Sequence, residues 1–234
     1  MNVFMCVDQA PLEMRGSVVF MPEDEVHSPF ETLTRTWDEQ YFLHHSLWKG
    51  PYDLSPILQL LAPGGSVLDV GCGSGRYLLP LARSGFRAVG ADISGRALAL
   101  LDPQYTRVVA DVQQLPFSDC SFHAVTCYGV LQHLTLAGQA KAVCELFRVL
   151  RHQGLAFVEV PGRLDMRYGR GRRIATDTFV REAIPHHYFS QSELNQLFQS
   201  VGFAVLSLDD KVTKKRYDNV IRQRHRIFMA MAKI

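Results

Sequence analysis

The chain has 234 residues, of which 47% are hydrophobic and 21% are charged, and its formal net charge at pH 7 is +2. This composition excludes a disordered chain and suits one α/β domain that buries a full core. The longest apolar runs are too short to cross a bilayer, and the first twenty residues lack the pattern of a secretory signal. We therefore expect no membrane association, and the small net charge indicates no class of partner.

Predicted helices and strands alternate along most of the chain. Residues 1–36 are interpreted as an N-terminal arm or cap, and residues 37–234 as a single domain. The periodicity predicts elements in this order: helices over 31–49 and 54–61, a strand over 66–70, a helix over 75–84, a strand over 87–91, a helix over 94–101, strands over 105–110 and 122–127, a helix over 137–150, a strand over 154–160, a helix over 190–201, and strands over 203–208 and 227–232. This alternation predicts an α/β fold with a doubly wound, mostly parallel sheet. Such sheets bind ligands beyond the carboxyl ends of their strands.

A glycine-rich turn follows the first predicted strand. From Val67 to Arg76 the sequence reads VLDVGCGSGR, so a strand leads into a turn that opens a helix. Glycines let a ligand approach the main chain, and a helix N-terminus presents free N–H groups; a tight turn without a ligand is the alternative. A nicotinamide dinucleotide site would have glycine at position 76, where this chain has arginine. Asp69 would also repel a pyrophosphate, whereas it would attract an ammonium or a sulfonium.

Acidic residues also end the second and third predicted strands. Asp92 follows the last glycine of the turn by 17 residues, and a carboxylate there can accept both hydroxyls of a ribose. Asp111 can accept a hydrogen bond from an adenine amino group, and Val112 offers its backbone N–H. The alternative roles are a helix-start aspartate for Asp92 and a turn aspartate for Asp111. The fourth strand ends near Cys127, and Tyr128 begins the next turn.

In this order and spacing, the four segments resemble the motifs of class I S-adenosylmethionine-dependent methyltransferases. The closest resemblance is to ubiquinone/menaquinone methyltransferase-like proteins with a methyltransferase type 11 domain. It covers about residues 60–160 and departs from the pattern at 152–153, where His-Gln replaces the usual Pro-Gly. The resemblance implies a seven-stranded, Rossmann-like sheet. Its last strand, at about 225–233, would be antiparallel and lie between the fifth and the sixth.

The resemblance also implies S-adenosylmethionine as the cofactor. Asp69 and Gly71 would hold its methionine end, Asp92 its ribose hydroxyls and Asp111 its adenine amine, while Ile93 would pack on the adenine ring. The full predicted cofactor site comes from four strand ends and consists of Asp69, Gly71, Cys72, Gly73, Gly75, Asp92, Ile93, Asp111, Val112, Cys127 and Tyr128.

Methyl transfer from a sulfonium requires that donor and acceptor be held in line, and it needs a base only if the nucleophile arrives protonated. The sequence therefore assigns no indispensable catalytic side chain. His133, His187 and Tyr188 are candidates, with structural roles as the alternative. Tyr41 is a candidate for the substrate site because an aromatic ring attracts a sulfonium, and core packing is its alternative role.

Two segments, 163–173 and 211–226, hold 12 of the 25 basic residues. The first begins residues 163–189, a predicted insertion on the substrate side. Its Arg170, Arg172 and Arg173 are candidates for binding acceptor phosphates, and a solvated loop is the alternative. RNA would be favoured if the two segments shared one face, and a small acidic metabolite is the other acceptor class. A similarity to methyltransferases of tRNA wobble uridines would add a small zinc-binding activator protein as a partner.

Five cysteines are scattered along the chain without a C-x-x-C pair. This pattern predicts reduced thiols, a cytoplasmic location and no metal site. Two other classes of protein compete with a methyltransferase: a scaffold subunit that binds the cofactor without catalysis, and a nicotinamide-dependent oxidoreductase.

Overall fold

The computed structural model describes residues 29–45, 47, 52–217 and 220–234. Most of the predicted arm or cap over 1–36 therefore lies outside the described residues. Its boundary at 36/37 falls inside the first helix, and the division of the chain into 1–36 and 37–234 stays a prediction. The helices are α1 (Pro29–His44), α2 (Ser55–Leu60), α3 (Leu78–Arg83), α4 (Gly95–Ala99), the 3-10 helix η1 (Leu131–His133), α5 (Leu136–Val149) and α6 (Gln191–Gln199).

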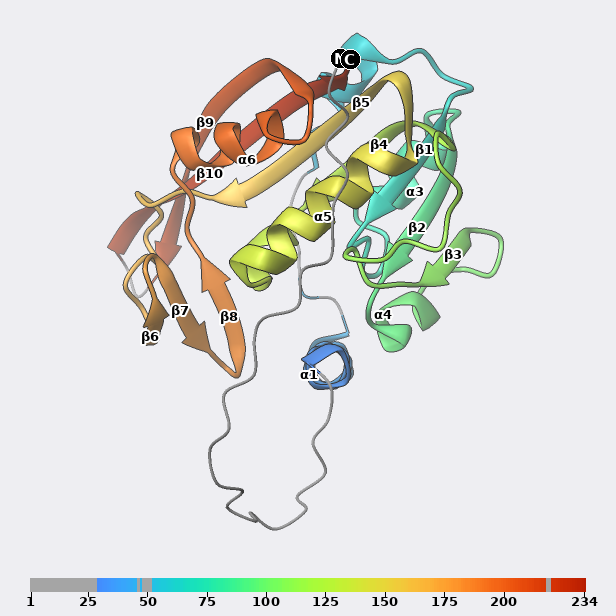
Figure 1. Cartoon of the computed structure of the whole chain (residues 1–234). Coiled ribbons are helices and arrows are strands. Elements are labelled where there is room, and N and C mark those ends of the chain that lie inside the picture. The colour runs from blue at the N-terminus through green and yellow to red at the C-terminus, as the bar shows by residue number, and fades with distance from the viewer. Residues whose placement is uncertain (1–28, 46, 48–51, 218–219) are drawn as a thin grey trace, which may run out of the picture.

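One large sheet organises the molecule (Figure 1). Its strands are β1 (Ser66–Val70), β2 (Arg87–Asp92), β3 (Thr106–Val109), β4 (Phe122–Tyr128), β5 (Leu150–Pro161), β9 (Phe203–Tyr217) and β10 (Val220–Lys233). They lie in the order β3-β2-β1-β4-β5-β10-β9, and β1 to β5 are parallel. The last strand, β10, is antiparallel to both of its neighbours. The predicted seven-stranded fold with an antiparallel last strand between the fifth and sixth is confirmed.

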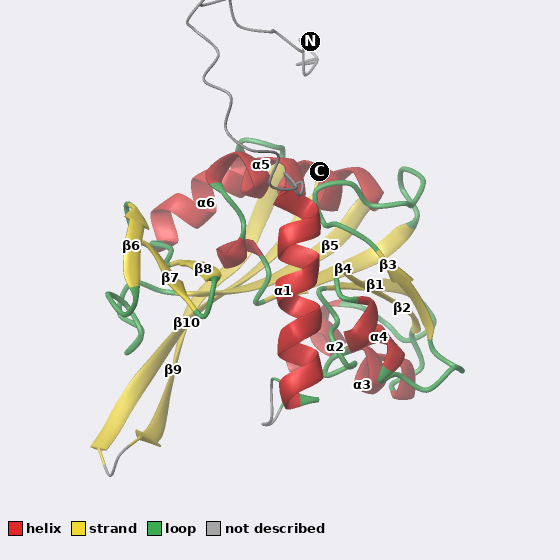
Figure 2. Ribbon diagram, turned by 90° about the horizontal axis from the view of Figure 1, so that it is seen from below, coloured by secondary structure: helices red, strands yellow, loops and turns green. Residues whose placement is uncertain are grey.

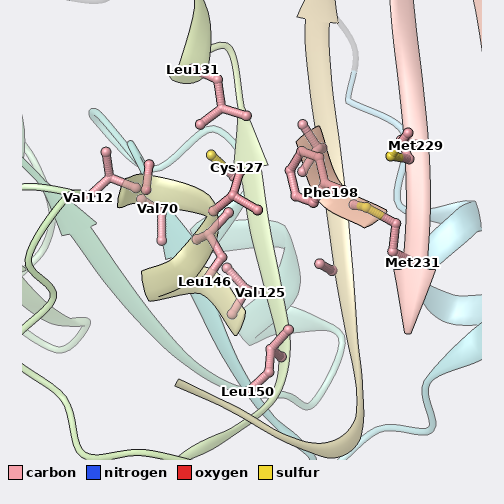
Figure 3. Packing of buried hydrophobic residues seen from close by; sticks show 14 of the residues in the cluster. Val70, Val112, Val125, Cys127, Leu131, Leu146, Leu150, Phe198, Met229 and Met231 are labelled. Carbon is pink, nitrogen blue, oxygen red and sulfur yellow. The ribbon is translucent and has the colours of Figure 1, made fainter. Parts of the chain in front are cut away.

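Helices cover both faces of this sheet. Alternate residues of a strand point to opposite faces, so Leu68 packs with α5 and α6 while its neighbour Val67 packs with α2 and α3. Figure 3 shows the first of these two layers, in which Leu146 of α5 and Phe198 of α6 cover β4 and β10. Helix α1 lies across the carboxyl-end edge of the parallel strands (Figure 2).

Local signals account for where several helices begin. Ser94 caps α4 by accepting a hydrogen bond from the backbone N–H of Ala97. Helix α6 begins with a capping box, in which Ser190 and Glu193 each accept a hydrogen bond from the other's backbone N–H. Helix α3 begins only at Leu78, three residues later than the predicted start at 75, because the glycines before it adopt positive φ angles that no α-helix contains.

The insertion over 163–189 folds into structure that the periodicity did not predict. It forms a second, antiparallel sheet in the order β6-β7-β8, from β6 (Arg172–Ala175), β7 (Thr178–Arg181) and β8 (Ile184–His187). All four residues of β6 are exposed, so no alternation of apolar and polar residues marks it in the sequence.

The last two strands are longer than the predicted 203–208 and 227–232, because β9 runs to Tyr217 and β10 starts at Val220. The second basic segment, 211–226, therefore lies mostly within these strands. Figure 2 shows this ribbon extending beyond the rest of the sheet. Cross-strand pairing of basic with polar residues, such as Lys214 with Gln223, continues the ladder where sequence propensity is weak. No helix in the described part of the chain is long and apolar enough to cross a membrane.

Candidate functional site

A cleft opens at the carboxyl ends of the parallel strands, beside the point between β1 and β4 where the strand order reverses. Its empty space is about 1160 Å³, including the part open to solvent. Residues that line it come from α1, from the turns after β1 to β4, and from β5 and β10. Of the predicted cofactor residues, the cleft is lined by Asp69, Gly71, Cys72, Gly73, Asp92, Ile93, Asp111, Val112 and Tyr128.

The glycine turn brings bare main chain to the cleft. Gly71 and Gly73 have φ angles of +68° and +53°. A Cβ at Gly71 would lie 2.2 Å from a methyl group of Val130, and one at Gly73 would lie 2.1 Å from the Tyr41 hydroxyl. The backbone N–H of Gly71 donates to the carbonyl of Ala91, which ties the turn to β2. Neither the backbone conformation nor the available space therefore accepts a side chain at these two positions.

Asp92 braces the glycine turn against β2. Its carboxylate accepts hydrogen bonds from the backbone N–H groups of Gly73, at 2.7 Å, and Ser94, at 2.9 Å. Burial raises the pKa of Asp92, and these two donors oppose the rise. The same side chain lines the cleft, so it combines a bracing role with a position that a ligand can reach.

Asp69 is the most unusual group in the cleft. One carboxylate oxygen accepts a hydrogen bond from the Thr126 hydroxyl at 2.7 Å, while the other is buried and has no hydrogen-bond partner among the described residues. Burial raises the pKa of Asp69 to about 7, opposed by hydrogen bonds from Thr126 and from the backbone of Leu78. Because a buried carboxylate oxygen without a partner is costly, this atom marks a place for a cationic or hydrogen-bond-donating ligand group.

Asp111 is oriented by the residue two positions later. It accepts hydrogen bonds from the backbone N–H of Gln113 at 2.9 Å and from its side-chain amide at 3.1 Å. With Val112 it lines the cleft beyond β3, on the far side of Asp92 from Asp69. The three aspartates therefore follow the ends of three neighbouring strands.

Two predicted cofactor residues lie outside the cleft lining. Cys127 is fully buried in the core layer of α5 and α6 (Figure 3). Adjacent residues of a strand point to opposite faces of the sheet, so Cys127 and the next residue, Tyr128, cannot both face the cleft. Gly75 closes the turn from behind, where a Cβ would lie 2.5 Å from Leu101. Gly75 thus shapes the turn without facing its ligand side.

Of the catalytic candidates, only His133 lines the cleft. Its Nδ1 lies 2.7 Å from the carbonyl of Pro185, so Nδ1 carries the proton and Nε2 accepts from the Gln132 amide at 3.1 Å. Burial lowers the pKa of His133 to about 4, so the ring is neutral at pH 7. Its edge contacts the ring of Trp37, at 4.9 Å between centroids.

The structure places the other two catalytic candidates in the insertion, away from the cleft lining. The ring nitrogens of His187 lie 2.8 Å from the Thr178 hydroxyl and 2.9 Å from a carboxylate oxygen of Glu193. Tyr188 is buried against the rings of Tyr168 and Phe179. His187 thus links the second sheet to α6, whereas Tyr188 packs within the insertion.

Of the four substrate candidates, one lines the cleft and three lie outside it. Tyr41 of α1 lines the cleft, with its hydroxyl against Gly73, and burial raises its pKa. Arg170, Arg172 and Arg173 are exposed on or just before β6, outside the cleft lining. They are thus free to meet a large acceptor from outside.

Several residues of the cleft lining were not predicted, and three of them bear on its chemistry. Trp37 of α1 forms part of its wall. Glu159 at the end of β5 and Arg226 of β10 face each other with 3.6 Å between Oε1 and Nε. A charged residue in the apolar run at 155–160 was a usable signal for Glu159. No signal in the sequence marked Arg226, since it reaches the cleft only because β10 lies beside β5.

Metal and thiol chemistry have little basis in the described part of the chain. No group of three or more His, Cys, Asp or Glu side chains there is arranged to hold a metal ion. Among the described residues, Cys72, Cys120, Cys127 and Cys144 form no disulfide.

Comparison with known proteins gives one family and several relatives. Residues 68–158 match the family model described as a methyltransferase domain. The chain is 33% identical over 147 residues to a probable S-adenosylmethionine-dependent methyltransferase of Mycolicibacterium smegmatis, covering 61% of this chain and 53% of that protein. It is 28% identical over 202 residues to a tRNA N(3)-cytidine methyltransferase of Danio rerio, covering 76% and 57%. The chain therefore spans about half the length of these relatives.

Solved structures share the fold. An S-adenosylmethionine-dependent methyltransferase of Methanosarcina mazei superposes with a TM-score of 0.67 at 21% identity, over 80% of this chain and 99% of that one. The 1,6-didemethyltoxoflavin-N1-methyltransferase of Burkholderia thailandensis, solved with bound S-adenosylhomocysteine, gives 0.66 at 16% identity, over 94% and 93%. At these identities the likeness establishes the fold alone.

Proposed function

We propose that this chain, which belongs to the class I S-adenosylmethionine-dependent methyltransferase family, transfers a methyl group from that cofactor to an O, N or C nucleophile of a small-molecule acceptor. The observation that carries the proposal is the buried oxygen of Asp69 without a partner, next to a glycine turn that excludes side chains. An ammonium group beside bare main chain suits that pair, whereas a pyrophosphate does not.

The residues of the cleft fit the cofactor one by one. Asp69 would bind the ammonium of its methionine end, and Asp92 its ribose hydroxyls. Asp111 would accept from the adenine amino group, with Ile93 packed on the ring. All four line the cleft, along the ends of β1, β2 and β3. The ubiquinone/menaquinone-like subfamily stays a prediction.

When bound, the cofactor would supply a methyl group activated by a positive sulfonium. The protein would then position the acceptor and exclude water, which suits a cleft covered by Trp37 and Tyr41 of α1. Helix α1 is held over the cleft by Asp38, which accepts hydrogen bonds from the Ser94 hydroxyl and the Arg96 backbone. His133 is a weak base because its pKa is about 4. We therefore assign it a structural role in the wall of the cleft, where it is bound to the carbonyl of Pro185.

Calorimetry and a transfer assay test the proposal. We expect S-adenosylmethionine and S-adenosylhomocysteine to bind, and NAD not to bind. Tritiated methyl groups should then appear in a component of a metabolite extract. Binding of NAD alone would indicate an oxidoreductase, and cofactor binding without transfer to any fraction would indicate a scaffold subunit.

Replacing Asp92 by alanine should weaken cofactor binding by about 1–3 kcal/mol, because the ribose hydroxyls and two backbone N–H groups lose their acceptor. Calorimetric titration with S-adenosylhomocysteine measures the change. Asp102→Ala is the control, since Asp102 lies outside the cleft lining and accepts only from its local backbone. An Asp92→Ala variant with an unchanged dissociation constant would remove Asp92 from the site.

RNA is the second candidate acceptor. Relatives named as tRNA methyltransferases occur in Danio rerio and Mus musculus, and Arg170, Arg172 and Arg173 form an exposed basic group. Other arginines of the two basic segments form ion pairs within the protein, as Arg224 does with Asp165. This pairing reduces the charge available to RNA phosphates. The small zinc-binding activator protein stays a prediction.

Replacing Arg170, Arg172 and Arg173 together by alanine separates the two acceptor classes. If RNA is the acceptor, methyl transfer to total tRNA should fall and its dependence on salt should become shallower, because each arginine that contacts a phosphate releases about one counterion. Cofactor affinity should stay unchanged in the same variant. Unaltered transfer would assign these arginines to a solvated surface.

We also infer a cytoplasmic location from the cysteines. The four that the structure describes form no disulfide with one another, and two of them, Cys72 and Cys127, are buried. Labelling of the thiols in intact cells would test the inference, and their recovery as disulfides would contradict it.

A further inference from the structure

The cleft has two sides, which meet at the point between β1 and β4 and are lined by different kinds of residue. Except for Tyr128, the predicted cofactor residues that line the cleft lie at the ends of β1, β2 and β3, on one side of the point where the strand order reverses. On the other side lie Tyr128 of β4, Glu159 of β5 and Arg226 of β10. Tyr128 and Glu159 are direct neighbours across β4 and β5, and Glu159 pairs across β5 and β10 with Phe228, two residues from Arg226. An acceptor therefore has this second side of the cleft available.

Arg226 is a largely buried arginine that lines the cleft. Its side chain is only 16% exposed, yet it donates no hydrogen bond to any described residue, and Glu159 at 3.6 Å is beyond hydrogen-bond distance. By contrast, Arg224 donates to Asp165 at 3.0 Å, and Arg148 makes five hydrogen bonds. A guanidinium has five N–H donors and stays charged, so leaving them without acceptors in a largely buried place is costly.

The surroundings of Arg226 are positive. Arg167 and Arg181 act on the neighbouring His186, and among the described residues neither forms an ion pair with a carboxylate. The nearby Asp165 is already engaged by Arg224 and by the backbone of His225. His186 and His133 are neutral at pH 7, because burial and these arginines lower their pKa values to about 2 and about 4. Glu159 is thus the one carboxylate facing Arg226 in the cleft.

We propose that the methyl acceptor carries an oxyanion, a carboxylate or a phosphate, and that Arg226 binds it on the β5–β10 side of the cleft. The proposal rests on the proposed function, since it concerns the acceptor of that same site. Because Nε faces Glu159, the terminal amino groups of the guanidinium would bind the anion. Arg167 and Arg181 would add attraction from a distance, and the Tyr128 hydroxyl, which is buried without a partner, would supply a further donor.

The experiment compares two charged probes with a neutral probe that carries the same phenyl ring. Protein saturated with S-adenosylhomocysteine is titrated by calorimetry with benzoate, phenyl phosphate and benzamide at constant ionic strength. We expect at least one of the two anions to bind about tenfold or more tightly than benzamide, the scale of charge-assisted hydrogen bonds. The preferred anion identifies the acceptor group as a carboxylate or a phosphate.

Two variants locate the effect. Arg226→Gln should remove the preference for the anion, whereas Arg216→Gln, an exposed arginine on the same ribbon, should keep it. Thermal melts establish that both variants fold. The proposal is overturned if neither anion binds more tightly than benzamide, or if the preference survives in Arg226→Gln.

The failure of the proposed function would look different. Titration with S-adenosylhomocysteine alone tests the cofactor site, and Arg226→Gln should bind it as the wild type does. If that ligand does not bind but the anions are preferred through Arg226, the methyltransferase proposal fails and the anion site stands. If S-adenosylhomocysteine binds but neither anion is preferred over benzamide, the anion site fails and the cofactor site stands.

Discussion

Gly71→Ala should destabilise the protein by about 2–4 kcal/mol and weaken S-adenosylhomocysteine binding by about 100-fold. The residue has a φ angle of +68°, which costs energy for any side chain. The added methyl group would also lie 2.2 Å from a methyl group of Val130, far inside van der Waals contact. The turn must therefore move, and it is the part of the cleft that is proposed to face the cofactor. Chemical denaturation and calorimetry measure the two effects.

Two further variants separate the clash from the backbone strain. Gly64 has a φ angle of +91° with nothing within 4 Å of an added Cβ, so Gly64→Ala should cost only the strain and leave cofactor binding intact. Val130→Ala in the Gly71→Ala background removes the clashing methyl group and should restore much of the binding. Equal losses in Gly64→Ala and Gly71→Ala would show that crowding against Val130 is irrelevant.

Asp69→Asn should lower the affinity for S-adenosylhomocysteine at pH 7.5 by about 10- to 100-fold, since a charge-assisted hydrogen bond to the ligand ammonium is lost. The amide can still accept the hydrogen bond from Thr126, so the fold should persist. The same variant should melt at a higher temperature than the wild type without ligand. The sign follows from the pKa, which burial raises to about 7: the carboxylate form destabilises the folded state increasingly as pH rises from about 4 to 7.

The pH dependence gives a sharper test of Asp69. Below pH 7 its carboxylate is protonated in the free protein and no longer attracts an ammonium, so wild-type affinity should fall between pH 7.5 and 5.5. Asp69→Asn should lose this dependence. The control ligand is 5′-methylthioadenosine, which lacks the amino-acid end and should bind wild type and variant equally. A variant with wild-type affinity at pH 7.5 would remove Asp69 from the methionine end.

The side of the cleft that faces the predicted cofactor was readable from the sequence. A glycine turn after an apolar strand, followed by Asp92 and Asp111 at the next two strand ends, depends only on local order along the chain. In parallel sheets the carboxyl ends of neighbouring strands meet at one edge, so local signals are enough to bring such residues together. The same reasoning predicted a mostly parallel sheet.

Some predicted site residues do not line the cleft, because a shift of one position along a strand reverses the direction of the side chain. Cys127 and Tyr128 were both expected in the site, but adjacent residues of a strand point to opposite faces, and only Tyr128 points to the cleft. His187 and Tyr188 were catalytic candidates, with structural roles as the alternative. In the structure His187 contacts Glu193 of α6, and Tyr188 packs on Phe179 within the insertion.

The sequence by itself determined the type of fold, the glycine turn and the three aspartates, because each depends on residues close together in the chain. Only the tertiary structure decided the other side of the cleft. Glu159 and Arg226 are 67 positions apart and meet because β10 runs antiparallel beside β5, while Trp37 arrives from a helix that precedes the whole sheet. No local pattern encodes those distances, since the pairing of distant strands and the docking of a helix depend on how the entire core packs.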